Sequence, residues 1–247
     1  MACGGIGMTD LLKTAIDAHG GLERWSRIQS IFVKASIGGD IWAIKSQTGA
    51  LKNVEIIAQT RQEHLIMDFP GQDKRTVFEP RHISVETGRG EIVDGRENPE
   101  LSFEGQQLET PWDTIHAAYF SGEALWTYLN VPFLFAQEGF RSEEIASIDV
   151  DGESCRRLQV TFPNHIKSHH RTQYFCFAAN GLLRRHDYMV DVLGGATGLN
   201  YASDYCEVDG IKFPTTRRVI AYKGDFEPVP EPVLVTIKFS DFRLIPG

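Results

Sequence analysis

The sequence predicts a mainly β fold of antiparallel strands, with one helix at the N-terminus and one helical segment in the middle of the chain. From residue 30 onward, apolar and polar side chains alternate with a period of two, which is typical of half-buried strands. An Asn-Gly pair at 180–181 separates two runs rich in aromatic and branched residues. This pair is the strongest short-range hairpin signal, because both residues of such a turn need a positive φ.

Length and charge narrow the class of protein. The chain has 247 residues, 42% of them hydrophobic, which is enough for a sizeable core. All-β barrels of this size often fold as one domain, so we expect a single domain over residues 1–247. The net charge is −8 and no basic block is present, which argues against a nucleic-acid partner. No stretch is apolar enough to span a bilayer, and no transmembrane segment is expected.

The cysteines and the N-terminus bear on the compartment. The four cysteines are far apart and form no C-x-x-C pattern, so neither a zinc ribbon nor a redox motif is expected. The first residues contain no basic n-region and no apolar h-region, both of which a secretory signal needs. We therefore expect residues 1–8 to be a disordered leader and the protein to be cytoplasmic, with free thiols. No phosphate-binding loop, dinucleotide-binding fingerprint or G-x-S-x-G pattern occurs, and no cofactor is predicted.

Most elements can be placed in order along the chain. Thr9 and Asp10 can cap a helix that runs to about His19, and a shorter amphipathic turn follows at 22–28. After the strand that begins at residue 30, further strands are expected at 40–45, 53–59, 64–69, 75–78 and 82–86. The Val-Asp-Gly triplets suit type I′ turns and are expected at strand reversals, at 93–95, 150–152 and 208–210. A flexible loop at 194–198 and strands at 201–208, 211–222 and 234–242 complete the chain.

The helical segment at 110–135 interrupts the strands. It opens with Thr-Pro-Trp-Asp, which has capping-box spacing and proline at the first helical position. Trp112, Ile115 and Tyr119 form an apolar stripe, with Trp126 beyond it. Two interpretations are open: a helix that packs this stripe on the sheet, or a mobile aromatic lid over a cavity. The aromatic surface at 112–135 is also a candidate contact for a protein partner, through Trp112 or Trp126.

Pairing parity assigns the side chains of the 169–190 hairpin to faces, because opposite residues share a face and successive side chains alternate. A two-residue loop places Gln173 opposite Tyr188, and a four-residue loop places it opposite His186. Either loop gathers the same polar set on one face: His169, Arg171, Gln173, Arg184, His186 and Tyr188. The opposite face carries His170 and Asp187, and the sequence does not decide which face points inward.

The hairpin around residues 209–210 places Asp204 and Arg217 as diagonal neighbours on its apolar face. Such a buried carboxylate–guanidinium pair is usually structural, and it is also how a cavity holds a polar group of a ligand. We expect this pair, together with the polar set of the 169–190 hairpin, to hold the head of any bound molecule.

These residues can be examined for two kinds of chemistry, general acid–base catalysis and metal binding. His169 or His186 as a base, with Tyr188 as a donor and an arginine to hold an anion, would suffice for proton transfer on an enolisable substrate. The alternative is a polar ladder on the outside of the sheet. Metal binding is not predicted, because the adjacent His169 and His170 point to opposite faces, and no carboxylate clearly joins His169 and His186.

The order of elements resembles the superfamily of lipoprotein-localisation carriers, LolA and LolB and their relatives. Soluble bacterial proteins of similar length resemble the chain more specifically, through the phrases at 18–25, 117–120, 125–129, 181–188 and 213–218. The resemblance implies an incomplete antiparallel β-barrel, curled like a half-pipe, with an N-terminal helix and a helical lid over an apolar cavity. Lipoprotein carriers need a signal peptide or a lipid anchor. This sequence shows neither, so we expect a small apolar ligand.

Two functional hypotheses follow. The first is binding of a hydrophobic small molecule or acyl chain, with Trp112, Tyr119 and Trp126 over the cavity and the polar residues named above at its head. The second is a cofactor-independent isomerase, cyclase or lyase that uses His169 or His186 as a general base. Half-barrels of this kind can host both, and the fold alone does not decide between them.

Overall fold

One long antiparallel sheet runs through the protein, which is described over residues 8–247 by a computed structural model. The strands are β1 (Ile28–Gly38), β2 (Val54–Gln59), β3 (Leu65–Asp68), β4 (Arg75–Glu79), β5 (His82–Glu86), β6 (Ile92–Glu97), β7 (Arg141–Val150), β8 (Glu153–Thr161), β9 (Thr172–Phe177), β10 (Leu183–Val190), β11 (Ala196–Val208), β12 (Ile211–Lys223), β13 (Glu227–Val229) and β14 (Val235–Pro246). The predicted leader at 1–8 lies outside the described residues except for Met8, which is exposed.

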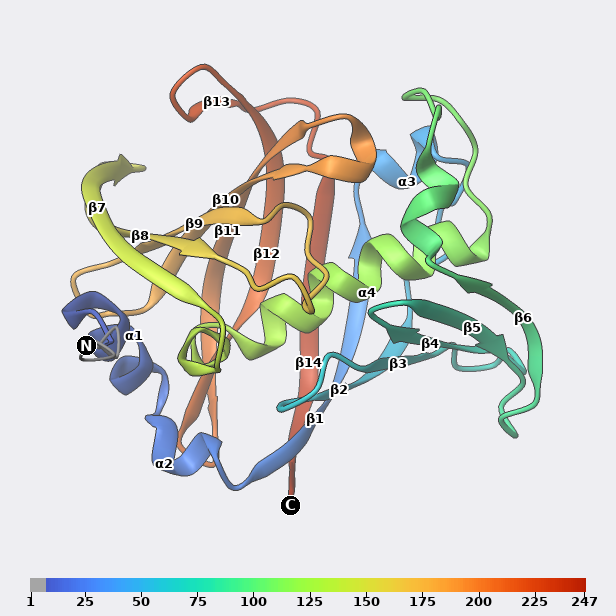
Figure 1. The fold of residues 1–247 in the computed structure, drawn as a ribbon, viewed down its shortest axis with the longest axis horizontal. Helices are drawn as coiled ribbons and strands as arrows, with labels where there is room; N and C mark the ends of the chain where they lie inside the picture. The colour runs from blue at the N-terminus through green and yellow to red at the C-terminus, as the bar shows by residue number, and fades with distance from the viewer. Residues whose placement is uncertain (1–7) are drawn as a thin grey trace, which may run out of the picture.

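Two meanders build this sheet. Strands β1 to β6 pair in sequence order on one side, and β7 to β12 do so on the other. Strand β14 pairs with both β1 and β12 and so joins the meanders. Strands β6 and β7 are left as the two edges, and the sheet curls into an open half-barrel (Figure 1). The prediction of a mainly β, incomplete antiparallel barrel is confirmed.

Helix α4 (Thr114–Asn130) runs across the concave face of the half-barrel (Figure 1). Ile115 and every residue from 117 to 130 are buried, so the helix is covered on all sides. A helix buried all round is a core element rather than an amphipathic surface helix. The predicted single stripe was therefore too narrow. The predicted aromatic surface at 112–135 is not exposed, because Trp112 and Trp126 lie inside the half-barrel.

Close contacts fix α4 against the sheet. A Cβ on Gly122 would lie 2.6 Å from Cγ of Phe78 on β4, so only glycine allows the helix to come this near. The indole Nε1 of Trp126 donates to the backbone oxygen of Gln59 at 2.8 Å, which ties the helix to the end of β2. The position of α4 thus depends on a specific fit to β2 and β4.

The start of α4 differs from the prediction. Asp113 is the N-cap, and its carboxylate accepts from the backbone N–H of His116 at 2.8 Å. The His116 ring accepts from the backbone N–H of Asp113 in return, which completes a capping box. The predicted box at Thr110 is wrong by three residues, because the Asp-x-x-His pair satisfies the same backbone donors further along the chain. A 3₁₀ turn, η2 (Phe133–Ala136), follows the helix.

The N-terminal helix α1 (Asp10–His19) forms as predicted, with the Thr9 hydroxyl accepting from the backbone N–H of Leu12. It packs on the turn between β9 and β10, where a Cβ on Gly181 would come within 2.7 Å of the Ala18 side chain. The short helix α2 (Leu22–Trp25) follows it. The Asn-Gly turn therefore serves both the hairpin and the contact with α1.

In the β9–β10 register, His186 lies opposite Phe175 and Asp187 opposite Tyr174. Extended by one residue, the same register pairs Gln173 with Tyr188, as predicted. A bulge between Leu183 and Arg185 shifts the register near the turn. As a result Leu183 is buried on the inner face and Arg184 points away from it. The face that carries Gln173, Phe175 and Phe177 on β9, with His186 and Tyr188 on β10, is the one that α4 covers.

Two further predictions are wrong. Residues 40–45 form helix α3 (Asp40–Ile44) and not a strand, because Asp40 and Ile41 donate their backbone N–H groups to residues 233 and 234 and start a helical turn. The triplet at 93–95 lies within β6, where Gly95 pairs with Ser84. The triplets at 150–152 and 208–210 do form the predicted turns, with positive φ at both the aspartate and the glycine.

Other features complete the fold. A 3₁₀ turn, η1 (Pro99–Phe103), precedes α4, and another, η3 (Asp191–Leu193), joins β10 to β11. Between residues 8 and 247, no helix is both long and apolar enough to cross a membrane. Cys155, Cys176 and Cys206 are unpaired thiols.

Candidate functional site

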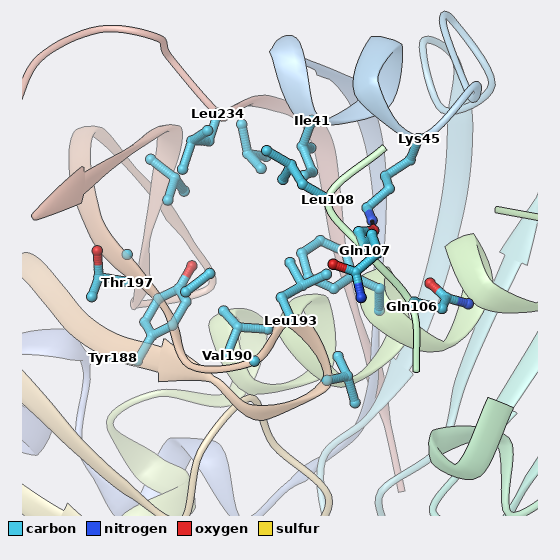
Figure 2. Close-up of a pocket in the computed structure, with 17 residues that line it drawn as sticks. Ile41, Lys45, Gln106, Gln107, Leu108, Tyr188, Val190, Leu193, Thr197 and Leu234 are labelled. Carbon is cyan, nitrogen blue, oxygen red and sulfur yellow. Dashed lines mark hydrogen bonds between the residues drawn. The ribbon is translucent and has the colours of Figure 1, made fainter. Parts of the chain in front are cut away.

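A partly enclosed apolar cavity, called the main cavity below, lies at one end of the half-barrel, between α3, the loop before α4 and the β10–β11 connection (Figure 2). Its volume is about 340 Å³, within the range of small-molecule sites. Most of the lining is aliphatic or aromatic: Ile41, Leu108, Phe120, Val190, Val192, Leu193, Val219, Leu234 and Val235. The cavity therefore favours an apolar occupant.

A few polar side chains stand among these apolar walls. Figure 2 shows Tyr188 and Thr197 on one side of the cavity and Lys45 with Gln107 on the other. Gly198, opposite Tyr188 in the register, leaves room for the phenol, because a Cβ there would lie 2.8 Å from the ring. Polar groups that are few and fixed in place are typical of sites that orient a mostly apolar ligand.

A buried polar layer lies beneath the cavity, between α4 and the inner face of β9 to β12. The hydroxyls of Tyr128 on α4 and Tyr188 on β10 share a hydrogen bond of 2.8 Å. Burial raises the pKa of both phenols, so each keeps its proton and the pair holds together as neutral groups. Through this bond the floor of the cavity is linked directly to the central helix.

Arg217 is the charged member of this layer and is only 2% exposed. Its guanidinium donates to the backbone oxygen of Tyr128 at 3.1 Å and lies 4.5 Å from the centre of the same ring. Its nearest side-chain acceptor is Asn200 Oδ1, at 3.5 Å. Burial lowers the pKa of Arg217, but arginine is still charged at any ordinary pH. Among residues 8–247, no carboxylate forms an ion pair with it.

The predicted Asp204–Arg217 pair is wrong. Asp204 has a φ of 55° and an exposed side chain that accepts from the neighbouring Ser203 hydroxyl. Alternation along a strand assumes extended backbone at every position, and a left-handed residue breaks it. Arg217 is thus buried without the partner that the pattern assigned to it.

His186 is buried inside the protein and lines neither the main cavity nor the two cavities beside His169. Its ring stacks on Phe175 at 4.1 Å, and its Nε2–H donates to Gln173 Oε1 at 2.5 Å. Gln173 is oriented by its own amide, which donates to the backbone oxygen of His170. Burial, followed by the charge of Arg217, lowers the pKa of His186 well below the usual value. His186 is therefore a neutral packing residue.

Of the two histidines predicted as a base, His169 is the one that lines a cavity. Its Nδ1–H donates to the buried carboxylate of Glu123 on α4 at 2.5 Å. The ring lines a small cavity next to Tyr188 and also a second, charged cavity of about 250 Å³ on its other side. A carboxylate that holds one ring nitrogen fixes the tautomer and leaves the other nitrogen to act as a base.

The remaining predicted residues are scattered. Tyr119 and the exposed Arg171 line the charged cavity, whereas Arg184 forms an ion pair with Glu153 on the other side of the sheet. Trp112 and Trp126 are packed in the core and line neither the main nor the charged cavity. Of the eleven predicted site residues, only Tyr188 lines the main cavity.

Lys45 and the residues around Leu193 are part of the site, and the sequence analysis missed them. Lys45 was assigned to a strand, whereas in a helix it lies one turn from Ile41 on the same face. Residues 194–198 were assigned to a flexible loop, but β11 begins at Ala196 and carries part of the wall. The i, i+3 spacing of the apolar Ile41 and Ile44 was the available signal for a helix at this position.

Comparisons with known proteins agree with the fold. No protein-family model matches the chain, and no curated protein matches it. A DUF1329 family protein from Desulfovibrio piger superposes with a TM-score of 0.54 at 16% identity, over 96% of this chain and 94% of that one. A LolA superfamily protein from Nitrosomonas europaea gives 0.52 at 9% identity, over 94% and 91%. The protein has a LolA/LolB-like fold. At these identities the LolA-like likeness concerns the fold alone.

A pH titration of stability tests whether His186 is sealed inside the LolA-like half-barrel. Unfolded histidine takes up a proton below about pH 6.5, and the folded ring does not, so the free energy of unfolding falls as the pH falls. His19, whose folded pKa is about 4, acts in the same direction. His186→Gln should make the slope between about pH 6.5 and pH 5 shallower by up to ~1.4 kcal/mol per pH unit, measured by urea unfolding. The exposed His165→Gln is the control. A slope unchanged in His186→Gln contradicts the assignment.

Proposed function

We propose that this protein binds a hydrophobic small molecule or an acyl chain in the main cavity. The observation that carries the proposal is the cavity of about 340 Å³, walled mainly by aliphatic side chains at the end of an open half-barrel. Transfer of apolar surface from water into such walls is favourable by about 25 cal/mol per Å². The volume suits one chain or one small molecule better than a bulky lipoprotein anchor with several chains.

The construction of the site supports binding without large rearrangement. Its walls belong to strands and helices that are fixed elsewhere, and the Tyr128–Tyr188 bond ties its floor to α4. The loop residues that cover it include Leu108, whose side chain is 59% exposed. An exposed leucine at the rim of an apolar cavity is in place to cover an occupant.

The cytoplasmic location that we expect from the sequence belongs to the same proposal. It is supported by the thiols of Cys155, Cys176 and Cys206, which are unpaired. Burial raises the pKa of all three, so they stay protonated and unreactive. A reducing compartment would keep thiols in this state.

Filling the cavity tests the proposal. Val219→Trp places an indole in the space that the ligand would occupy, so the Kd for N-phenylnaphthylamine should rise at least about tenfold, measured by fluorescence titration. Val93→Trp is the matched control, because Val93 is 68% exposed on β6 and lines no part of the cavity. Equal affinities for the two variants, both folded by circular dichroism, would count against binding at this site.

A second candidate function rests on the His169–Glu123 pair. We propose that, if the protein is an enzyme, it transfers a proton on an enolisable substrate with His169 as the base. The pair is buried on the α4 side, and Glu123 orients the ring. The cavity of about 20 Å³ beside Tyr188 has room for no more than a water, so the substrate would enter the charged cavity of about 250 Å³, which His169 also lines. His186, which the sequence suggested equally, lines neither cavity.

Isotope exchange separates this enzyme from a binding protein. Wild type should catalyse exchange of the α-protons of a methyl ketone such as decanone in D₂O, followed by NMR. A positioned base contributes about 10²–10⁴-fold, so His169→Asn should lose most of the rate. His186→Asn should keep it. Exchange no faster than in buffer, with decanone bound, would leave only the binding function.

A further inference from the structure

Lys45 carries a buried ammonium beside the main cavity. Lys45 is the C-cap residue of α3, and its side chain has no exposed surface. The three N–H donors meet one acceptor in the described part of the chain, the backbone oxygen of Gln107 at 3.0 Å. The Trp112 ring lies 5.2 Å away and provides a weak second contact. A buried ammonium with one acceptor is poorly compensated.

No carboxylate balances this charge at close range. Lys45 forms no ion pair with any residue between 8 and 247. The charge of Glu109, which is exposed, acts on it from further away, and burial is the stronger effect on its pKa, which it lowers. An ammonium in this position would gain from an anion placed in the cavity.

The acceptor of Lys45 belongs to the loop that covers the cavity. Gln106, Gln107 and Leu108 all line the space, and the loop has no helix or strand of its own there. At one end of this loop, the side-chain oxygen of Gln106 accepts a hydrogen bond from the Trp112 indole N–H at 2.9 Å. The Lys45–Gln107 bond is thus the contact through which α3 holds the middle of the loop, and Figure 2 shows it at the edge of the cavity.

Arg217 adds a second positive charge behind the cavity. It lies two residues from Val219 on β12, so the two side chains share the inner face of the sheet, and Val219 lines the cavity. Arg217 also has no ion-pair partner within the part of the chain that is described. The nearest buried carboxylate on α4, that of Glu123, is held by His169. Lys45 is thus the buried cation that lines the cavity, and Arg217 lies in the polar layer beneath it without a carboxylate partner.

We propose that the ligand is a single-chain amphiphile with an anionic head, and that Lys45 binds the head while the apolar walls hold the chain. This inference rests on the proposed binding function and adds the class of ligand to it. The head replaces or shares the Gln107 oxygen as acceptor, and the loop at 106–108 shifts to admit it. A neutral ligand would leave the ammonium with its single acceptor.

Calorimetric titration with four probes of equal chain length tests the head group: decanoate, decyl phosphate, decanol and decyltrimethylammonium. The two anions should bind wild type at least about tenfold more tightly than decanol. A desolvated, charge-assisted hydrogen bond contributes enough free energy to lower the Kd by about that factor. The cationic probe should bind more weakly than decanol. The order of decanoate and decyl phosphate identifies the source of the anion as a fatty acid or a phosphate monoester.

Variants at Lys45 locate the effect. Lys45→Met should bring the ratio of the decanoate affinity to the decanol affinity down to about one, whereas Lys45→Arg should keep the preference for anions. The exposed Lys52→Met is the matched control and should behave as wild type. If Lys45→Met does not fold, the order of the four probes on wild type still decides.

The outcomes are distinct for the two proposals. Equal binding of decanol and decanoate to wild type would overturn the anionic ligand and leave the binding function standing. An anion preference that survives in folded Lys45→Met would overturn the role of Lys45. Failure of all four probes to bind would overturn the binding function itself.

Discussion

The rest of the structure depends on one constraint: the sheet curls into a half-barrel, but its two edge strands, β6 and β7, do not pair with each other. A sheet that curls without closing leaves a concave apolar face, and that face must be covered to exclude water. Helix α4 covers most of it, which is why the helix is buried on every side and why Gly122 is needed against Phe78. One end of the half-barrel lies beyond the reach of the helix. The cavity occurs there, closed by α3, η3 and the loop before α4.

The same helix creates a polar layer inside the protein. Tyr128 and Glu123 project from α4 toward Tyr188, His169 and Arg217, and each makes at least one hydrogen bond there. Polar groups at this depth cost stability unless they are paired, and Arg217 lacks the carboxylate that such a charge usually has. Lys45 also lacks a carboxylate partner and donates only to the backbone oxygen of Gln107. Hydrophobic side chains would fill these places at no electrostatic cost, and for Lys45, which lines the cavity, the proposed anionic ligand would account for the charge.

Local sequence patterns predicted the strands well, since a period of two and glycine-containing turns depend on neighbouring residues alone. They also predicted that His186 and Tyr188 share one face of the hairpin with Gln173, but not that this face points inward. They failed where the tertiary structure decided the outcome. Asp204 leaves the sheet pattern through its left-handed backbone, and the bulge at Leu183 turns Arg184 outward. The all-round burial of α4 is imposed by the half-barrel around it. Lys45 was missed because no local pattern shows that a lysine will be buried beside a cavity.

Purification of the protein from its own host tests the central claim most directly. Native mass spectrometry before and after organic extraction would show whether a molecule co-purifies with the protein and would identify it. We expect a single amphiphilic molecule per chain, lost on extraction and bound again when added back. A protein that carries nothing, and that takes up no amphiphile when the extract is returned to it, would contradict the account of the cavity as a binding site.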